Sequence, residues 1–223
     1  MFGITMINTP IVIPTVNGKC LPVLETSAGI YCPEAELLVH WIEPKSWGTN
    51  HNEMLPPIFA KYDSVILAND DIVLNPTSYK YLMEDVAQLK QVHGDKLGFV
   101  SACSDWARPS QNIRNNKGLP PLNDIKWAWE HSAHQVPVIA PLFCWMSKLA
   151  YNDLGKFPPI NWYADDIACY DLTKKGYVHY VSRSYVHHVG SQTTGADNSK
   201  LSEDALSWVR ANRPDFMRDW FGQ

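Results

Sequence analysis

The sequence predicts an α/β protein built on a mostly parallel central sheet. Short runs of apolar, branched residues alternate with longer segments of helical periodicity, as in parallel sheets that helices cover on both faces. The chain has 223 residues, enough to bury a core of this kind. It contains no internal repeat or low-complexity tract. We therefore expect one domain over residues 1–223.

The first half of the chain shows the clearest alternation of strands and helices. Thr77–His93 is the most regular helix, because its apolar residues share one face, Asn75 is placed to cap it and Gly94 to end it. Gly29 is expected to end an earlier helix, and Pro56-Pro57 to break another. The expected elements are a strand at Ile11–Ile13, a helix from Leu21 to Ala28, a strand at Glu36–Ile42, a helix at His51–Lys61, a strand at Val65–Ala68 and the helix at Thr77–His93.

The second half begins with a strand and a long polar segment. Residues Asp105–Pro121 are rich in turn formers, and a loop of this length is often a lid over a functional site. A later helix starts at Tyr163-Ala164-Asp165-Asp166 and stops at Gly176. The expected elements are a strand at Leu97–Ala102, an extended segment at Val136–Trp145, a helix at Ser147–Leu154, a helix at Tyr163–Lys175, paired strands within Tyr177–Val186 and a C-terminal helix carrying Leu201, Ala205 and Val209.

Composition narrows the class of protein. The net charge of -4, without any block of Lys or Arg, gives no general attraction to nucleic acid. The five cysteines are scattered and lack the paired spacing of a zinc site, which is typical of a reduced intracellular protein. No segment is long and apolar enough for a membrane span. We expect a soluble, cytoplasmic protein.

Three polar residues, Asn69, Asp70 and Asp71, directly follow the buried strand Val65–Ala68. In open parallel sheets ligands bind beyond the carboxyl ends of the strands, so this is the expected place for a site. Two adjacent carboxylates repel each other, and a hard divalent cation with oxygen ligands would relieve the repulsion. The acids could instead belong to a turn before the next helix, but Asn75 already supplies the cap for that helix.

The second half adds an acidic pair, Asp165 and Asp166, and a histidine pair, His187 and His188. Acids are common in the first turn of a helix because the helix dipole favours them, so the acidic pair alone indicates only a helix start. The histidines are neighbours in a strand-like segment, where successive side chains face opposite sides. Only one of the two can therefore reach a given site.

Three spaced patches together resemble the inverting glycosyltransferases of the GT-A fold, the family 2-like group related to bacterial rhamnosyl-, glucosyl- and galactosyltransferases. Ile11–Asn17 is similar to the first strand and nucleotide loop of that group, and Leu67–Asp71 to its Asp-X-Asp region. The run from Leu154 to Ser191 resembles the part that carries a catalytic acid pair, a helix ending in Gly-Tyr and a late histidine. Trp220-Phe221-Gly222 is similar to the close of many members. Each patch is weak alone, and their order and spacing give the resemblance its weight.

The resemblance implies a three-layer GT-A sandwich with a nucleotide-sugar-binding half over 1–104 and an acceptor and catalytic half over 105–223. It implies that Asp71 and His188 hold Mn²⁺ or Mg²⁺, and a histidine ligand favours Mn²⁺. Asp166 is the expected catalytic base, with Asp165 orienting acceptor hydroxyls. The helix after this pair is about one residue shorter than in relatives, which leaves open which of the two acids is the base.

The resemblance also suggests residues for the donor. Thr15, Asn17, Asn69 and Asp70 are expected nucleotide contacts. Glu43 is the available stand-in for the acid that reads uracil in this group. In addition, Trp145 is expected to form a wall of the sugar pocket.

The implied activity is metal-dependent, inverting transfer of a hexose from a nucleotide diphosphate sugar to a hydroxyl of a glycan or other acceptor. UDP-linked glucose or galactose is the expected donor. One alternative is a metal-dependent nucleotidyltransferase or sugar-nucleotide hydrolase, and another is a non-catalytic carbohydrate-binding protein on the same fold. A further interpretation places a metal between His131, His134 and Glu130, although this spacing lacks a clear additional ligand.

Overall fold

The computed structural model describes residues 9–113, 132–190 and 199–222, in which eight strands form one sheet. The strand order is β2-β1-β3-β7-β5-β8-β4, with β6 paired to β8 outside this path. The strands are β1 (Ile11–Thr15), β2 (Leu37–Trp41), β3 (Ser64–Ala68), β4 (Ile72–Leu74), β5 (Leu97–Ser104), β6 (His134–Val136), β7 (Phe143–Ser147) and β8 (Val178–His188).

Most strands of this mixed sheet run in one direction. β1 is parallel to β2 and β3, and β5 is parallel to β8. β7 is antiparallel to both β3 and β5, so β5 and β8 run the same way as β1. Only β4, β6 and β7 of the eight described strands run the opposite way. The expected mostly parallel sheet is therefore confirmed.

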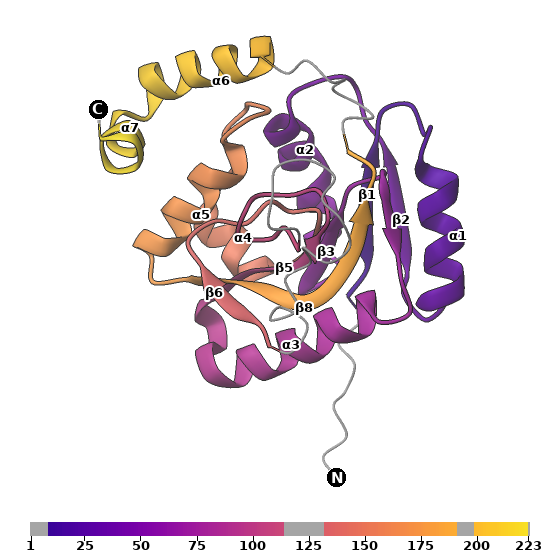
Figure 1. Cartoon of the computed structure of the whole chain (residues 1–223). Helices are drawn as coiled ribbons and strands as arrows, with labels where there is room; N and C mark the ends of the chain where they lie inside the picture. The colour runs from indigo at the N-terminus through magenta and orange to yellow at the C-terminus, as the bar shows by residue number, and fades with distance from the viewer. Residues whose placement is uncertain (1–8, 114–131, 191–198, 223) are drawn as a thin grey trace.

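Helices cover both faces of the sheet and make a three-layer structure (Figure 1). α1 and α3 pack on one face, and α2, α4 and α5 pack on the other. The helices are α1 (Leu21–Tyr31), α2 (Trp47–Phe59), α3 (Ser78–His93), α4 (Lys148–Leu154), α5 (Ala164–Lys174), α6 (Ser199–Asn212) and α7 (Pro214–Phe221), with a 3₁₀ turn η1 (Gly94–Lys96).

The central strands supply apolar side chains to both layers. In β3, Val65 and Leu67 belong to the core under α2, whereas Ile66 and Ala68 belong to the core under α1 and α3. All five residues of β3 are buried. Burying an aliphatic side chain of this size contributes about 1.5–3 kcal/mol relative to exposure, so β3 is a strong anchor for the polar residues that follow it.

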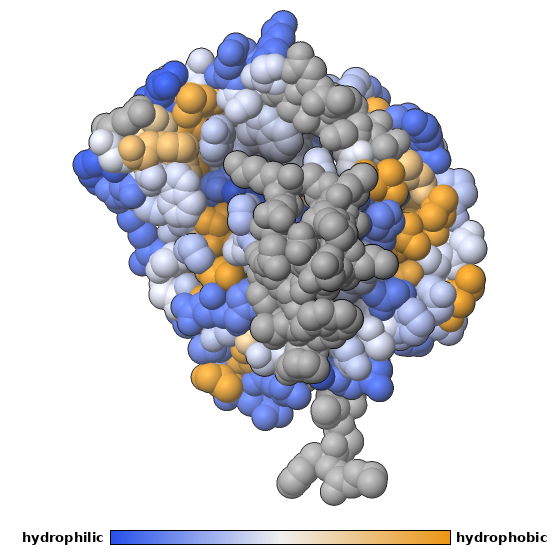
Figure 2. Space-filling view, in the orientation of Figure 1, coloured by the Kyte–Doolittle hydropathy of each residue, from blue (hydrophilic) through white to orange (hydrophobic). Residues whose placement is uncertain are grey.

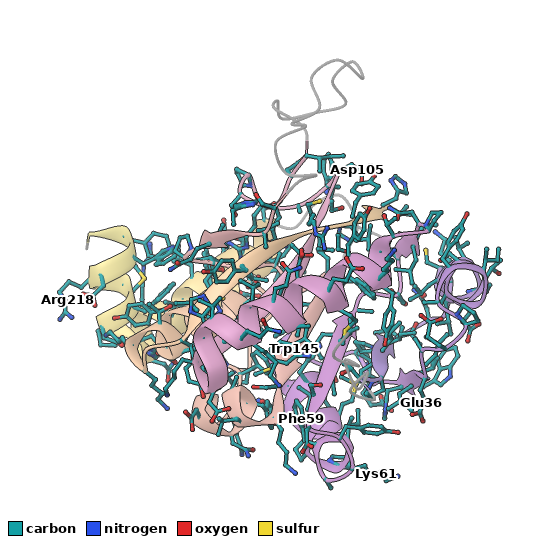
Figure 3. All side chains as sticks on the ribbon, turned by 90° about the horizontal axis from the view of Figure 1, so that it is seen from below. Glu36, Phe59, Lys61, Asp105, Trp145 and Arg218 are labelled. Carbon is teal, nitrogen blue, oxygen red and sulfur yellow. The ribbon has the colours of Figure 1, made fainter. Side chains whose placement is uncertain are left out.

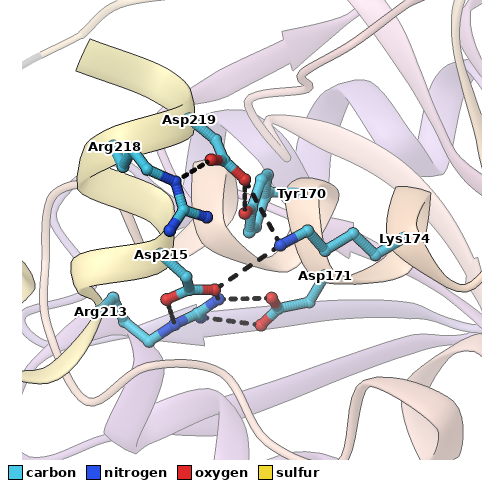
Figure 4. Close-up of polar contacts among 7 residues, drawn as sticks. All are labelled: Tyr170, Asp171, Lys174, Arg213, Asp215, Arg218 and Asp219. Carbon is cyan, nitrogen blue, oxygen red and sulfur yellow. Dashed lines mark hydrogen bonds and ion pairs between the residues drawn. The ribbon is translucent and has the colours of Figure 1, made fainter. Parts of the chain in front are cut away.

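The C-terminal helices pack on α5 through a third apolar cluster that includes Ala205, Val209 and Phe216. A polar network joins the same elements (Figure 4). The Arg213 guanidinium donates to both oxygens of Asp171, at 2.9 and 2.6 Å, and to Asp215. α6 and α7 are therefore attached to α5 by apolar and charged contacts together.

The face of the molecule in Figure 2 is mostly hydrophilic, and apolar atoms gather on its right side over α1. Val23 and Ile30 of this helix are 52% and 63% exposed. Among the described residues, no helix combines the length and the apolar character that crossing a membrane would require.

Two helices are longer than expected. α1 continues through Gly29 to Tyr31, because Gly29 stays in a helical conformation within a helix packed through Leu24 and Ala28. α2 begins at Trp47 and runs through Pro56-Pro57 without a break. Both prolines lie on the exposed side of α2, so water can satisfy the carbonyl groups that lose a helical partner.

The boundaries and number of the strands also differ from those expected from the sequence. Val136–Trp145 is split between β6 and β7, because Pro137 and Pro141 lie between them and cannot donate to a strand ladder. Residues 178–188 form the single strand β8 instead of paired strands, since β5 lies on one side of it and β4 and β6 on the other. Ile72–Leu74 forms β4, an element that the sequence analysis did not predict.

The start of α3 is also adjusted. The helix has Thr77 at the cap position, and Asn75, two residues earlier, accepts the backbone N–H of Thr77 at 2.9 Å through its side-chain oxygen. Gly94 follows the last helical residue with a positive φ of 55°, as expected of a residue that ends a helix.

Candidate active site

A cavity of about 620 Å³ lies beyond the carboxyl ends of β1 and β3. Ligands of open α/β sheets bind in this position. Residues from both halves of the chain line the cavity, among them the charged or polar side chains of Asn69, Asp70, Asp71, Arg108, Asp165 and His188. The cavity thus brings together the two acidic patches and the late histidine that the sequence analysis selected.

Asp70 is fixed by the end of β1. The Thr15 hydroxyl donates to Asp70 Oδ2 at 2.5 Å, and the same hydroxyl oxygen accepts the backbone N–H of Gly18 at 3.0 Å. Burial raises the pKa of Asp70, the bond from Thr15 opposes this rise, and the charge of Asp71 adds to it. Thr15 does not line the cavity but orients a carboxylate that does.

Asp71 and His188 meet because β4 pairs with β8. Ile72 lies opposite His188 in this antiparallel ladder, and the backbone N–H of Val189 donates to the carbonyl of Asp71 at 3.0 Å. His188 Nε2 is 3.1 Å from Asp71 Oδ1, and the amide nitrogen of Asn69 is 3.5 Å from the same ring nitrogen. Burial lowers the pKa of His188, but the bond to Asp71 and its charge outweigh this effect and raise it.

The donor set of Asp71 and His188 fits a divalent cation. The Nδ1 atom of His188 is 2.7 Å from the carbonyl oxygen of Trp106, which can only accept, so Nδ1 bears the proton and the neutral ring has its lone pair at Nε2. Nε2 and Asp71 Oδ1 are then two facing acceptors that a proton or a cation would bridge. Within residues 9–113, 132–190 and 199–222, no group of three His, Cys, Asp or Glu forms a closed site. A cation would therefore need further oxygen ligands from water or a substrate phosphate.

Asp105 contacts both histidines through different oxygen atoms. One oxygen of Asp105 accepts the backbone N–H of His188 at 3.1 Å, and the other lies 2.7 Å from His187 Nδ1. The His187 side chain is half-exposed, whereas His188 lines the cavity. This arrangement agrees with the expectation that only one of the two rings reaches the site.

The second acidic pair begins α5 and is bound by one arginine. Nη1 of Arg108 donates to Asp166 Oδ1 at 2.8 Å. Nη2 donates to Asp166 Oδ2 at 2.6 Å and to Asp165 Oδ2 at 2.8 Å. Asp165 lines the cavity, and Asp166 lies behind it with only 3% of its surface exposed. Burial and the charge of Asp165 raise the pKa of Asp166 to about 6, against the lowering effect of Arg108.

The loop before α5 is tied to α2. Asn52 exchanges two 2.8 Å hydrogen bonds with the backbone of Phe157, and the backbone N–H of Trp47 donates to Asn161 Oδ1 at 2.8 Å. Tyr163, the residue before α5, has the left-handed conformation φ 65°, ψ 0°, which is rare for a bulky side chain. Such outliers persist where surrounding structure fixes the backbone, and here the outlier sets the direction of the helix that bears Asp165.

Arg108 and Asp105 were not among the site residues predicted from the sequence. Both lie in the polar segment Asp105–Pro121, which was interpreted as a lid. Residues 105–113 of this segment are described and form a turn beside β5, and the remainder lies outside the described residues. The available signal was that Asp105 directly follows a buried strand and that Arg108 comes shortly after it, the same kind of signal that drew attention to Asp71.

No family model matches the sequence, and no curated protein sequence matches it. The chain is similar in fold to several solved structures. GalNAc-T7, crystallised with UDP, GalNAc and Mn²⁺, matches with a TM-score of 0.57 and 12% identity over 97% of this chain and 58% of that chain. S. aureus TarS (residues 1–349), in complex with UDP-GlcNAc, matches with a TM-score of 0.53 and 13% identity over 92% of this chain and 67% of that one. A197 from STIV matches with a TM-score of 0.52 and 14% identity over 78% of this chain and 81% of that chain.

These likenesses confirm the expected fold class. The chain has a GT-A fold. At 12–14% identity they establish the fold alone, and they agree with the arrangement of sheet and helices described above. The GT-A fold places Asp71, His188 and Asp165 around one cavity although they are far apart in the sequence.

Trp145, expected to form a wall of a sugar pocket, does not line this cavity. The residue belongs to β7, is 1% exposed and packs in the core under α3, on the other face of the sheet (Figure 3). Side chains alternate along a strand, so Trp145 and its neighbour Cys144 face opposite layers. Among the described residues, the tryptophans that line the cavity are Trp47, Trp106 and Trp162.

Two further expected donor contacts lie outside the cavity wall. Asn17 is exposed, and its side-chain oxygen accepts the backbone N–H of Lys19 at 2.9 Å, so it shapes the turn after β1. Glu43 is also exposed, and its backbone carbonyl accepts from Asn50 at 3.2 Å. Neither is among the described residues that line the cavity, whereas Val16 and Ile42, their neighbours in sequence, do line it.

The alternative metal site around His134 is not supported by its described member. His134 Nε2 lies 3.3 Å from the backbone carbonyl of Ser110. Its two proposed partners, Glu130 and His131, lie outside the described residues.

Proposed function

We propose that the chain is a metal-dependent, inverting glycosyltransferase that moves a hexose from a UDP-linked sugar to a hydroxyl of a glycan or other acceptor. One observation carries the proposal. A single cavity is lined by Asp71 and His188, the proposed cation ligands, and by Asp165, which forms a carboxylate pair with the buried Asp166 at the start of α5. A transferase of this kind needs both: neutralisation of the leaving diphosphate, and a base for the attacking hydroxyl.

Asp165 is the better candidate for the base, in place of Asp166. Asp165 lines the cavity and contacts Arg108 through Oδ2, whereas Asp166 is buried and both of its oxygens accept from Arg108. A base must reach the proton that it removes, so exposure to the cavity decides between them. Asp166 would then act indirectly, by holding Arg108 in position through two hydrogen bonds.

The reaction follows from these positions. Asp165 accepts the proton of the acceptor hydroxyl as the hydroxyl oxygen forms a bond to the anomeric carbon. The bond between that carbon and the diphosphate oxygen breaks, and its electron pair leaves with the nucleoside diphosphate. Attack from the face opposite the leaving group inverts the configuration. When bound, a divalent cation would neutralise charge on the leaving diphosphate.

The likeness to known structures supports the donor class. GalNAc-T7 was crystallised with UDP and TarS with UDP-GlcNAc. In this chain the residues of 1–104 at the cavity follow β1, β2 and β3, and those of 105–223 include the carboxylates of α5. We propose that the first part holds the nucleotide sugar and that the second part holds the acceptor.

The test is a screen of nucleotide sugars for release of nucleoside diphosphate, with Mn²⁺, with Mg²⁺ and with EDTA. The donors are UDP-glucose, UDP-galactose, UDP-GlcNAc, UDP-GalNAc and GDP-mannose, each with and without a mixture of oligosaccharide acceptors. We expect UDP release that needs both the cation and the acceptor, and a product with inverted anomeric configuration by NMR.

Three outcomes would contradict the proposal. Release that is equally fast without any acceptor would indicate a sugar-nucleotide hydrolase. Glycan binding without donor turnover would indicate a carbohydrate-binding protein. Turnover that is unchanged by EDTA would remove the cation from the reaction.

A further inference from the structure

Arg108 is the one cationic side chain in contact with the carboxylate pair among the contacts of the described residues. Its two terminal nitrogens make three bonds of 2.6–2.8 Å to Asp165 and Asp166. Its Nε atom is buried and has no partner in the described part of the chain. The guanidinium is therefore directed at the two carboxylates, at the expense of one of its own donors.

The turn that carries Arg108 is rigidly anchored. The backbone carbonyl of Arg108 accepts from the N–H groups of Gln111 and Asn112, each at 2.8 Å. Gln111 is fully buried, and its side chain exchanges bonds of 2.9 and 2.6 Å with the backbone of Ala140. Arg108 is thus held in place by the core beside β5, independently of its contacts to α5.

The same turn also fixes the proposed cation site. Asp105 accepts the backbone N–H of His188, and the carbonyl of Trp106 accepts from its ring. Within residues 105–108, Asp105 and Trp106 therefore contact His188, and Arg108 contacts Asp165 and Asp166. This arrangement links the two pairs through one hydrogen-bonded segment, which distinguishes Arg108 from an isolated surface ion pair.

We propose that Arg108 is a positioning residue for sugar transfer, whose guanidinium holds Asp165 and Asp166 side by side in fixed orientation while Asp165 removes the acceptor proton. This inference rests on the proposed function. Two adjacent carboxylates repel each other, and a cation shared between them offsets that repulsion. The bidentate fork also sets the carboxylate planes, which a point charge cannot do.

The electrostatics of the pair agree with this role. Burial and the charge of Asp165 already raise the pKa of Asp166, while the charge and hydrogen bonds of Arg108 lower it. Without Arg108, Asp166 would hold a proton at higher pH. Its removal should therefore move the pH dependence of the reaction, which loss of packing alone would not do.

The chain contains a matched comparison for Arg108. Arg213 bridges Asp171 of α5 and Asp215 of α7 with the same kind of bidentate contact (Figure 4). Arg213 is not among the described residues that line the cavity. Its replacement reports the effect of losing an arginine that bridges two carboxylates, one of them on α5, at a position away from the cavity.

The experiment compares Arg108→Met, Arg108→Lys and Arg213→Met with the native protein, using the donor and acceptor found in the screen. The measurements are kcat and KM from pH 5 to 9, the affinity for UDP with Mn²⁺ by calorimetry, and the thermal midpoint.

For Arg108→Met we expect kcat at pH 7 to fall at least about tenfold and the acid limb of the pH–rate profile to move up by about one pH unit or more, with UDP affinity retained. Arg108→Lys should keep the acid limb near its native position and still lose kcat, because it keeps the charge without the fork. Arg213→Met should lower the thermal midpoint and leave the profile unchanged.

The outcomes separate this inference from the proposed function. An active native protein whose acid limb and kcat are unchanged in Arg108→Met would overturn the role of Arg108 and leave the transferase assignment intact. An equal shift of the limb in Arg213→Met would also overturn it, because the effect would then be general. A native protein that turns over no nucleotide sugar would overturn both.

Discussion

His188 Nε2 lies 3.1 Å from Asp71 Oδ1, so an imidazole from the end of β8 and a carboxylate from the end of β3 face each other in the cavity. The ladder between β4 and β8 fixes this approach through the pairing of Ile72 with His188. The carbonyl of Trp106 fixes the ring by accepting from Nδ1. The pair is therefore set by backbone structure on both sides, as a preorganised ligand pair should be.

Replacing either member of this pair should weaken cation-dependent donor binding. For Asp71→Asn or His188→Ala we expect the affinity for UDP in the presence of Mn²⁺ to fall by at least about tenfold, because one of the two proposed protein ligands is lost. Calorimetry with and without EDTA measures it. His187→Ala is the matched control, since this ring points to Asp105 and should leave the affinity unchanged. Equal losses in all three variants would show that the effect is not specific to the pair.

The two acids of α5 should differ in their effect on the reaction. Asp165→Asn should lower kcat by about 10²–10⁴, the usual contribution of a general base, while UDP binding is kept. Asp166→Asn should lower kcat less, because Asp166 acts through Arg108, and should also lower the thermal midpoint, since it removes one charge of a buried ion pair. Steady-state kinetics and thermal unfolding measure both. A near-normal Asp165→Asn beside an inactive Asp166→Asn would return the base to Asp166.

The rate should fall as the pH drops below about 6. Burial and the charge of Asp165 raise the pKa of Asp166 to about 6, so Asp166 is ionised above this value and protonated below it. A protonated Asp166 loses the charge that holds Arg108 in its bidentate contact. We therefore expect kcat to fall below pH 6 toward the level of Asp166→Asn, with a plateau above pH 6. A rate that is flat between pH 5 and 8 would contradict this account.

The contact between α2 and the loop before α5 should be sensitive to volume. A Cβ atom on Gly48 would lie 1.8 Å from the carbonyl oxygen of Pro158, so Gly48→Ala forces this loop away from α2. We expect a loss of about 3 kcal/mol or more in the free energy of unfolding, at the upper end of overpacking costs, together with loss of activity. Urea denaturation measures the first quantity.

Gly29→Ala provides the control for that substitution. Its Cβ would meet nothing within 4 Å, and the residue is inside α1, so alanine should stabilise the protein by about 0.5–1 kcal/mol. If both substitutions gave the same change in stability, the close approach at Gly48 would not be the cause.

Local pattern determined much of the fold. The apolar run at Val65–Ala68 and the periodic segment at Thr77–His93 were predicted as a strand and a helix, and the structure confirms both. These features depend on contacts within a few residues and on burial of one or two faces, which the order of side chains expresses directly. The helix that starts near Asp165 was predicted for the same reason.

Predictions that depended on contacts between distant parts of the chain were less accurate. Pro56-Pro57 does not break α2, because the buried side of that helix continues on both sides of the prolines. Trp145 was placed in the sugar pocket, but the register of β7 against β3 turns it to the other face. A shift of one residue in a strand exchanges its faces, and register is set by partners that are distant in the sequence.

The sequence by itself determined which chemical groups are present and at which strand and helix ends they lie: Asp71 after β3, Asp165 in the first turn of α5 and His188 at the end of β8. The tertiary structure alone decided that these ends meet in one cavity, that Asp165 rather than Asp166 faces it, and that Arg108 bridges the pair. The physical reason is that element ends follow from short-range pattern and burial, whereas the distance between two such ends depends on strand order and register across the whole sheet.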